Sequence, residues 1–195
     1  MKIWAIGDLH LSFAIPNKEM SVFGNKWQKH YEKIAADWDH KVSQDDIVLI
    51  PGDISWAMKM EDVAADLQWI HERPGTKVMI RGNHDYWWDT IAKVRKILPP
   101  SIYALGNDAI CLQDIAIAGA RLWDSDEYQF GEVIDMQPRP STLPEEKKID
   151  ENEKIFVREL GRLRMSLEAM PKIAKMKIVL THYPPIGLDL KESRV

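Results

Sequence analysis

Short runs of apolar, β-branched residues alternate along the chain with stretches in which apolar residues recur every three or four positions. The runs are too short for helices and are typical of buried strands. They occupy residues 2–6, 47–50, 77–80, 109–112, 115–118 and 177–180. The helical spacing predicts helices over 27–42, 60–70 and 87–98, and a long one from 145 to about 170. Strands that alternate with helices predict an α/β fold.

The second half of the chain has a different pattern. Its two strands within residues 108–118 flank a tight Gln113-Asp114 turn, which is typical of an antiparallel hairpin and predicts a mixed sheet. Residues 124–140 hold few apolar residues, several charges and two prolines, which predicts a loop. A loop of this length is either a solvent-exposed surface loop or a lid over a site. The long helix would follow it as a covering helix. Without an internal repeat or a linker, residues 1–195 are predicted to form one domain.

Composition excludes several classes of protein. The chain has 195 residues, 45% of them hydrophobic, and a formal net charge of −4, which argues against global disorder and against a polycationic nucleic-acid coat. Its single cysteine, Cys111, can form neither an internal disulfide nor a thiolate metal site, so a metal would need oxygen and imidazole ligands. No signal peptide or membrane span is recognisable, so we expect a cytoplasmic location and no membrane partner.

Metal-ligand residue types follow four of the predicted strands directly. They are Asp8 and His10 in the first case, Asp53 in the second, Asn83, His84 and Asp85 in the third, and His182 in the last. In α/β sheets the carboxyl ends of the strands converge on one crevice, so residues far apart in sequence are expected to meet there.

The spacing and types of these residues suit divalent cations. Asp8 and His10 are two apart, and in an extended backbone alternate side chains share a face, so both would grip one ion. The carboxylate of Asp53 has two oxygens that can bridge two ions, while Asn83 and His182 would complete the ligand set of the second ion. Carboxylate, amide and imidazole ligands suit manganese, iron, zinc or nickel. Two such ions clamp a phosphoryl oxygen and activate a bridging water for in-line attack.

The motifs D-x-H, G-D and G-N-H-D and a later histidine, in this order, resemble those of the calcineurin-like metallophosphoesterase superfamily. The resemblance spans Asp8 to His182. It implies a four-layer α/β/β/α sandwich with two mixed β-sheets. It also implies that Asp8 and His10 bind the first metal, that Asp53 bridges, and that Asn83 and His182 bind the second. His84 would lie beside the scissile phosphate, as a general acid or a stabiliser of charge.

One departure from the family pattern affects the expected ligand count. The family closes with a G-H-x-H motif that supplies one histidine to each metal, and no Gly-His pair occurs in this sequence. The chain is therefore interpreted either as a fragment that lacks its last strands or as a naturally short product. In both cases each ion would lack one ligand, which predicts weakened metal affinity.

Four further residues are weaker candidates. Asp85 would either cap a helix that starts at Tyr86 or orient a histidine. Arg81 and Arg121 would bind a substrate phosphate, because a planar guanidinium fits phosphate geometry, with ordinary ion pairing as the alternative. Trp56 would wall the pocket or stack on a flat leaving group, with ordinary core packing as the alternative.

These observations predict a metal-dependent hydrolase of phosphomonoesters or phosphodiesters that uses two divalent cations. The alternative is an interaction scaffold that keeps the fold and has lost turnover. Expected partners are a phosphorylated small molecule or a nucleotide. The sequence has no basic stripe with interleaved aromatic residues, so we expect no long-footprint nucleic-acid binding.

Overall fold

The computed structural model describes residues 1–125, 127–128, 130 and 145–195. Its chain divides into two compact units, Met1–Gly106 and Asn107–Val195, which are described separately. Each unit combines a β-sheet with helical structure, so the predicted mixed α/β class is confirmed. The prediction of a single domain over 1–195 stays a prediction.

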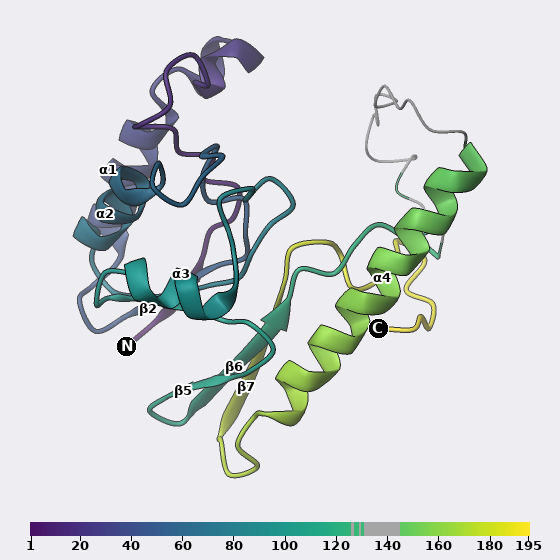
Figure 1. The fold of residues 1–195 in the computed structure, drawn as a ribbon. Helices are drawn as coiled ribbons and strands as arrows, with labels where there is room; N and C mark the ends of the chain where they lie inside the picture. Colours follow the sequence, from purple (N-terminus) through teal and green to yellow (C-terminus); the bar gives the residue numbers. More distant parts are fainter. Residues whose placement is uncertain (126, 129, 131–144) are drawn as a thin grey trace. The chain divides into compact units, whose positions relative to one another are not determined.

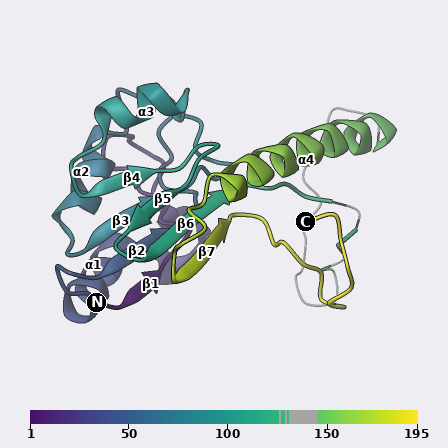
Figure 2. The ribbon, with the colours of Figure 1, turned by 90° about the horizontal axis from the view of Figure 1, so that it is seen from below.

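The first unit is built on a four-stranded sheet (Figure 2). Its strands are β1 (Ile3–Ala5), β2 (Ile47–Ile50), β3 (Thr76–Met79) and β4 (Ile102–Ala104), in that order. All three pairings are parallel, because a helix lies in each connection: α1 (His30–Lys41), α2 (Ala64–Glu72) and α3 (Ile91–Ile97). The resemblance implies two mixed sheets, but the described part of this one is purely parallel.

The core of the first unit continues past the strand ends. Leu9, Leu11 and Ile54 are at most 1% exposed, although they lie in the loops after β1 and β2. They join Ile50 and Met79 of the strands in one buried cluster. The polar residues next to these buried leucine and isoleucine side chains therefore cannot move along the loop without exposing core side chains to solvent.

Three helices begin later than the apolar spacing predicts. The first is preceded by two short 3₁₀ helices, η1 (Met20–Phe23) and η2 (Asn25–Trp27), and by Lys29 in the left-handed region with φ of 50°. The second begins at Ala64 rather than at residue 60, and the third at Ile91 rather than at residue 87, because Thr90 is still extended. Strand β4 is absent from the sequence prediction; it has only three residues, of which Tyr103 is exposed.

The second unit pairs a three-stranded sheet with one long helix (Figure 1). Strands β5 (Ile110–Leu112) and β6 (Ile115–Ala120) are antiparallel, and β6 pairs in parallel with β7 (Met176–Thr181), so the predicted hairpin and mixed sheet are confirmed. Gly119 permits this pairing, because a Cβ there would lie 2.3 Å from the carbonyl oxygen of Leu180.

Helix α4 (Glu145–Glu168) packs against this sheet, as predicted for a covering helix. Its Leu163 clusters with Ala120 and Leu122 at the end of β6. The buried hydroxyl of Ser166 accepts a hydrogen bond from the Gly119 amide at 2.9 Å and donates to the Asp108 carbonyl at 2.5 Å. Residues 126, 129 and 131–140 of the predicted loop or lid lie outside the described residues. Within the described part of the chain, no helix has the length and apolar character needed to cross a membrane.

A buried lysine of β3, Lys77, extends its ammonium group to the carbonyl oxygens at the C-terminal end of α2. The Nζ of Lys77, in β3, donates hydrogen bonds to the carbonyl oxygens of His71 and Arg73 and to Ser101 Oγ. The side chain is fully buried, and this burial, with the nearby guanidinium of Arg73, lowers the pKa of Lys77 to about 8.

This lysine predicts a pH-dependent stability. Between about pH 8 and the ordinary lysine pKa of 10.5, the unfolded chain holds a proton that the folded chain has released. The free energy of unfolding should therefore rise with pH across this window. We expect Lys77→Met to remove this rise, measured by urea unfolding at pH 7.5 and 9.5. The exposed Lys96→Met is the control, and the same slope in Lys77→Met as in the wild type would contradict the assignment.

Candidate metal centre

The carboxyl ends of β1, β2 and β3 lead into the three loops that carry most of the predicted site residues. Within the first unit, these loops bring Asp8, His10 and Asp53 together. The Nε2 atom of His10 lies 3.7 Å from Asp8 Oδ1 and 3.5 Å from Asp53 Oδ2. A carboxylate oxygen of Asp8 and one of Asp53 are within 4.8 Å of each other. Three donor atoms from two loops thus face one small volume.

The backbone of these donors is not extended, contrary to the expectation for Asp8 and His10. Asp8, His10 and Asp53 all adopt the left-handed region, with φ of 55°, 45° and 53°. Their side chains still share one side, because the intervening Leu9 is buried. The first two loops are joined by backbone hydrogen bonds from Asp8 N to Gly52 O at 3.1 Å and from His10 N to Asp53 O at 3.0 Å. Unfavourable backbone conformations at three neighbouring donors are typical of a functional site.

Asp53 is held on one oxygen and faces the cluster with the other. Its Oδ1 accepts a hydrogen bond from the His84 amide at 2.8 Å, whereas its Oδ2 faces His10. The side chain is 3% exposed, in contrast to 66% for Asp8. Gly82 is needed here, because a Cβ at this position would lie 2.1 Å from Asp53 Oδ1. The cluster is therefore closed beneath Asp53 and open to solvent beside Asp8.

Asp85 fixes the loop that carries Asp53. Its carboxylate is fully buried, and it does not cap a helix at Tyr86, since α3 begins only at Ile91. The alternative, that Asp85 orients a histidine, stays a prediction. It accepts five hydrogen bonds of 2.7–3.2 Å, from the Trp87 indole and from the backbone amides of Asp53, Ile54, Ser55 and Gly82. Burial raises the pKa of Asp85, and the amide hydrogen bonds oppose that rise.

Two positioning residues were missed by the sequence analysis. The buried ring of His30 contacts the Leu9 carbonyl oxygen through Nε2 at 2.8 Å, which fixes the peptide between Asp8 and His10. Asp66, fully buried in α2, accepts hydrogen bonds from Ser55 Oγ and from the Phe13 amide. Burial raises the pKa of Asp66. His30 belongs to no recognisable sequence motif. For Asp66, the signal available in the sequence is a charged residue on the apolar face of a predicted helix.

His84 and Trp56 lie next to the donor cluster. The Trp56 indole stacks on the His10 ring, with centroids 4.6 Å apart and planes 20° apart. The His84 ring lies 5.0 Å from the indole and 5.8 Å from the His10 ring. Asn83 and Arg81 belong to the same loop as His84 and are half-buried. The structure thus gathers His84 and Trp56 around the two carboxylates and the imidazole.

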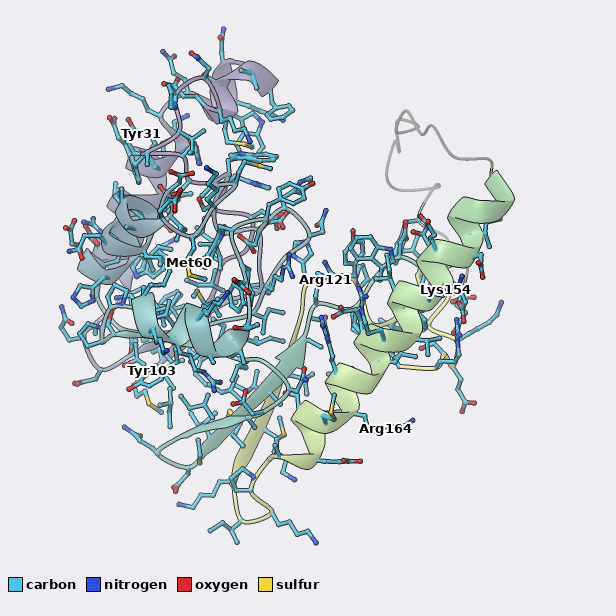
Figure 3. All side chains as sticks on the ribbon, in the orientation of Figure 1. Tyr31, Met60, Tyr103, Arg121, Lys154 and Arg164 are labelled. Atoms are coloured by element: carbon cyan, nitrogen blue, oxygen red, sulfur yellow. The ribbon has the colours of Figure 1, made fainter. Side chains whose placement is uncertain are left out.

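The second unit carries His182 and Arg121. His182 follows β7, and its ring lies 5.4 Å from that of Tyr183. Arg121 follows β6 beside α4 (Figure 3), where its Nη2 is 3.0 Å from Oε1 of the buried Glu159. Its guanidinium also lies 4.5 Å from the Trp123 ring centroid. Because Glu159 already neutralises this charge, a phosphate would compete with an internal ion pair at Arg121.

The donor set of the first unit fits a divalent cation. It combines two carboxylates and one imidazole, a set that suits borderline divalent metals. Oδ2 of Asp53 is directed at the cluster, while the other oxygen of this carboxylate is fixed by an amide. Two carboxylates that share a small volume also repel each other unless a cation lies between them. A phosphate oxygen could approach such a cation from the exposed side of Asp8.

Comparison with known proteins identifies one family. The model of the family described as calcineurin-like phosphoesterase matches residues 1–194. The Gene 66 protein of Mycobacterium phage L5 is 38% identical over 82 residues, which are 42% of this chain and 39% of the phage protein. The Gene 66 protein of Mycobacterium phage D29 is 36% identical over 83 residues, 43% and 40% of the two chains. The chain thus spans about two fifths of the length of the curated relatives it matches.

A search of solved structures adds one chain, a protein of unknown function, AQ665, from Aquifex aeolicus. Its TM-score is 0.40 at 16% identity, with 80% of this chain and 73% of that chain covered.

The hydrogen bonds of Asp85 predict a large effect of a small substitution. Asp85→Asn keeps the shape of the side chain but replaces one acceptor oxygen by an NH₂ group, which would face amide donors. We expect the free energy of unfolding to fall by about 3 kcal/mol. Urea unfolding measures it, with the exposed Asp45→Asn as the control expected to change little. A loss as small as that of the control would show that Asp85 does not hold the two loops together.

The contact of His30 with the Leu9 carbonyl predicts a role in metal affinity. His30→Ala should weaken Mn²⁺ binding by about tenfold, because the peptide between Asp8 and His10 loses its support. Isothermal titration calorimetry measures this, and the exposed His40→Ala in the same helix is the matched control. Unchanged Mn²⁺ affinity with a lowered unfolding midpoint would mean that His30 is merely part of the core.

Proposed function

The chain belongs to the calcineurin-like phosphoesterase family, and from its donor cluster we propose that it hydrolyses phosphomonoesters or phosphodiesters of small molecules or nucleotides with divalent cations. The observation that carries this proposal is the convergence of Asp8, His10 and Asp53 within 3.5–4.8 Å of one another, beside His84. The family match over residues 1–194 supports the reaction class, and the donor cluster supplies the residues that would perform it.

The proposed ligands would bind two cations. Asp8 and His10 would hold one cation, and Asp53 would share its carboxylate between two. We assign Asn83 and His182 to the second cation on the family resemblance. Manganese, iron, zinc or nickel fit these donors. Bound cations supply charge neutralisation at the phosphate and a nucleophile derived from water.

His84 is the residue we assign to the leaving group. Its ring lies 5.8 Å from that of His10, close to the donor cluster without being part of it. A protonated imidazole can give a proton to the departing ester oxygen. Its backbone amide is fixed by Asp53 Oδ1, which ties the position of this acid to that of the bridging carboxylate.

The test of this function is metal-dependent turnover that depends on Asp53. Asp53→Asn removes a negative charge and one oxygen donor, so we expect hydrolysis of p-nitrophenyl phosphate or bis-p-nitrophenyl phosphate to fall by about a hundredfold or more. Elemental analysis should show less bound metal in this variant. Asp45→Asn, which is exposed and outside the cluster, should keep both.

Three outcomes separate the alternatives. Metal-dependent hydrolysis supports the hydrolase, and faster hydrolysis of the monoester or of the diester shows which ester type the enzyme prefers. Turnover that survives Asp53→Asn would contradict the proposed ligand set. A folded wild-type protein that neither binds metal nor hydrolyses either ester would leave the interaction scaffold as the better explanation.

A further inference from the structure

A small apolar pocket lies next to the donor cluster, within the first unit. Its volume is about 200 Å³, and it is lined by Asn17, Lys18, Glu19, Val22, Phe23 and Trp56. Pockets that enclose a whole small ligand typically measure about 300–1,000 Å³. A pocket of this size therefore accepts one ring-sized part of a larger molecule.

The segment that forms this pocket is anchored on Trp56. The indole Nε1 of Trp56 donates to Met20 Sδ at 3.4 Å, and Met20 is only 7% exposed. Lys18 Nζ donates to the Trp56 carbonyl oxygen at 3.4 Å and lies 6.0 Å from the indole centroid. Between these anchors and α1, Val22 and Phe23 are 71% and 61% exposed. Two large apolar side chains are thus presented to solvent by a segment that is itself fixed.

Trp56 connects this pocket to the donor cluster. The same side chain lines the pocket, stacks on His10 at 4.6 Å and lies 5.0 Å from His84. A group in the pocket would therefore be separated by a single side chain from the cation ligand His10 and from the acid His84.

We propose, resting on the phosphoesterase function above, that this pocket binds a flat aromatic ring on the leaving group of the substrate. The walls favour such a ring over an aliphatic group, because Trp56 and Phe23 both offer aromatic surfaces for stacking. The ammonium of Lys18 lies near the indole, where it would attract the carbonyl or anionic substituents of the ring. A nucleobase and a simple aryl group share this chemistry.

The test compares esters that differ in the leaving group. The substrates are phenyl phosphate, adenosine 5′-monophosphate and glycerol 2-phosphate, each with Mn²⁺. Phe23→Ala should lower kcat/KM for at least one ring-bearing ester by about five- to tenfold relative to glycerol 2-phosphate. Which of the two esters responds distinguishes a nucleobase from an aryl group. Tyr103→Ala, at an exposed aromatic residue of β4 that does not line the pocket (Figure 3), should leave this ratio unchanged.

A binding measurement keeps the pocket and the proposed function separable. Phenylphosphonate and methylphosphonate are titrated into the Mn²⁺-treated protein by calorimetry, and the wild type should prefer phenylphosphonate by about fivefold or more. Phe23→Ala should remove this preference. Turnover of all three esters with no change in their ratios in Phe23→Ala would overturn the pocket and leave the function standing. If no ester is hydrolysed, the calorimetric titration tests the ring-binding pocket by itself. Equal affinity for the two phosphonates, or no binding of either, would overturn the proposed pocket.

Discussion

The site of the first unit depends on one buried carboxylate. Asp85 receives amide hydrogen bonds from its own loop at Gly82 and from the loop after β2 at Asp53, Ile54 and Ser55. Burying a carboxylate costs free energy unless its oxygens are fully hydrogen-bonded. Here each oxygen accepts at least two such bonds, so the cost of burial is offset only when both loops adopt their native course. The position of Asp53 is therefore coupled to the position of His84.

Backbone strain at the donors is maintained by the core beneath them. Asp8, His10 and Asp53 have positive φ, which costs of order 1 kcal/mol or more at each non-glycine residue. The intervening Leu9 and the following Ile54 are fully buried, and relaxing the strain would move them out of the core. Hydrophobic burial at alternate positions thus stabilises a polar geometry that the loop would not adopt alone.

The sequence predicts the parts of this arrangement that rest on local patterns. Apolar runs locate most strands, and the polar residues directly after them locate Asp8, His10 and Asp53. The sequence could not show that these donors adopt left-handed backbone, or that Asp85 holds amides instead of capping a helix. Both features arise from contacts between loops more than 30 residues apart. His30 falls within the helix predicted over 27–42, and the local pattern there does not reveal its partner, the Leu9 carbonyl in the loop after β1.

Electrostatics within this unit couple cation binding to folding. Asp53 is almost fully buried, and its charge is among the causes that raise the pKa of Asp85. The two carboxylates thus repel each other in a region from which water is largely excluded, and Asp8 adds a third negative charge at the exposed edge. A cation bound by the donor cluster would offset this repulsion in the folded state, whereas in the unfolded chain the three carboxylates are far apart and solvated. Binding to the folded state alone stabilises it by mass action. The arrangement that suits the cluster to a metal ion would therefore also make the fold more stable when a metal is bound.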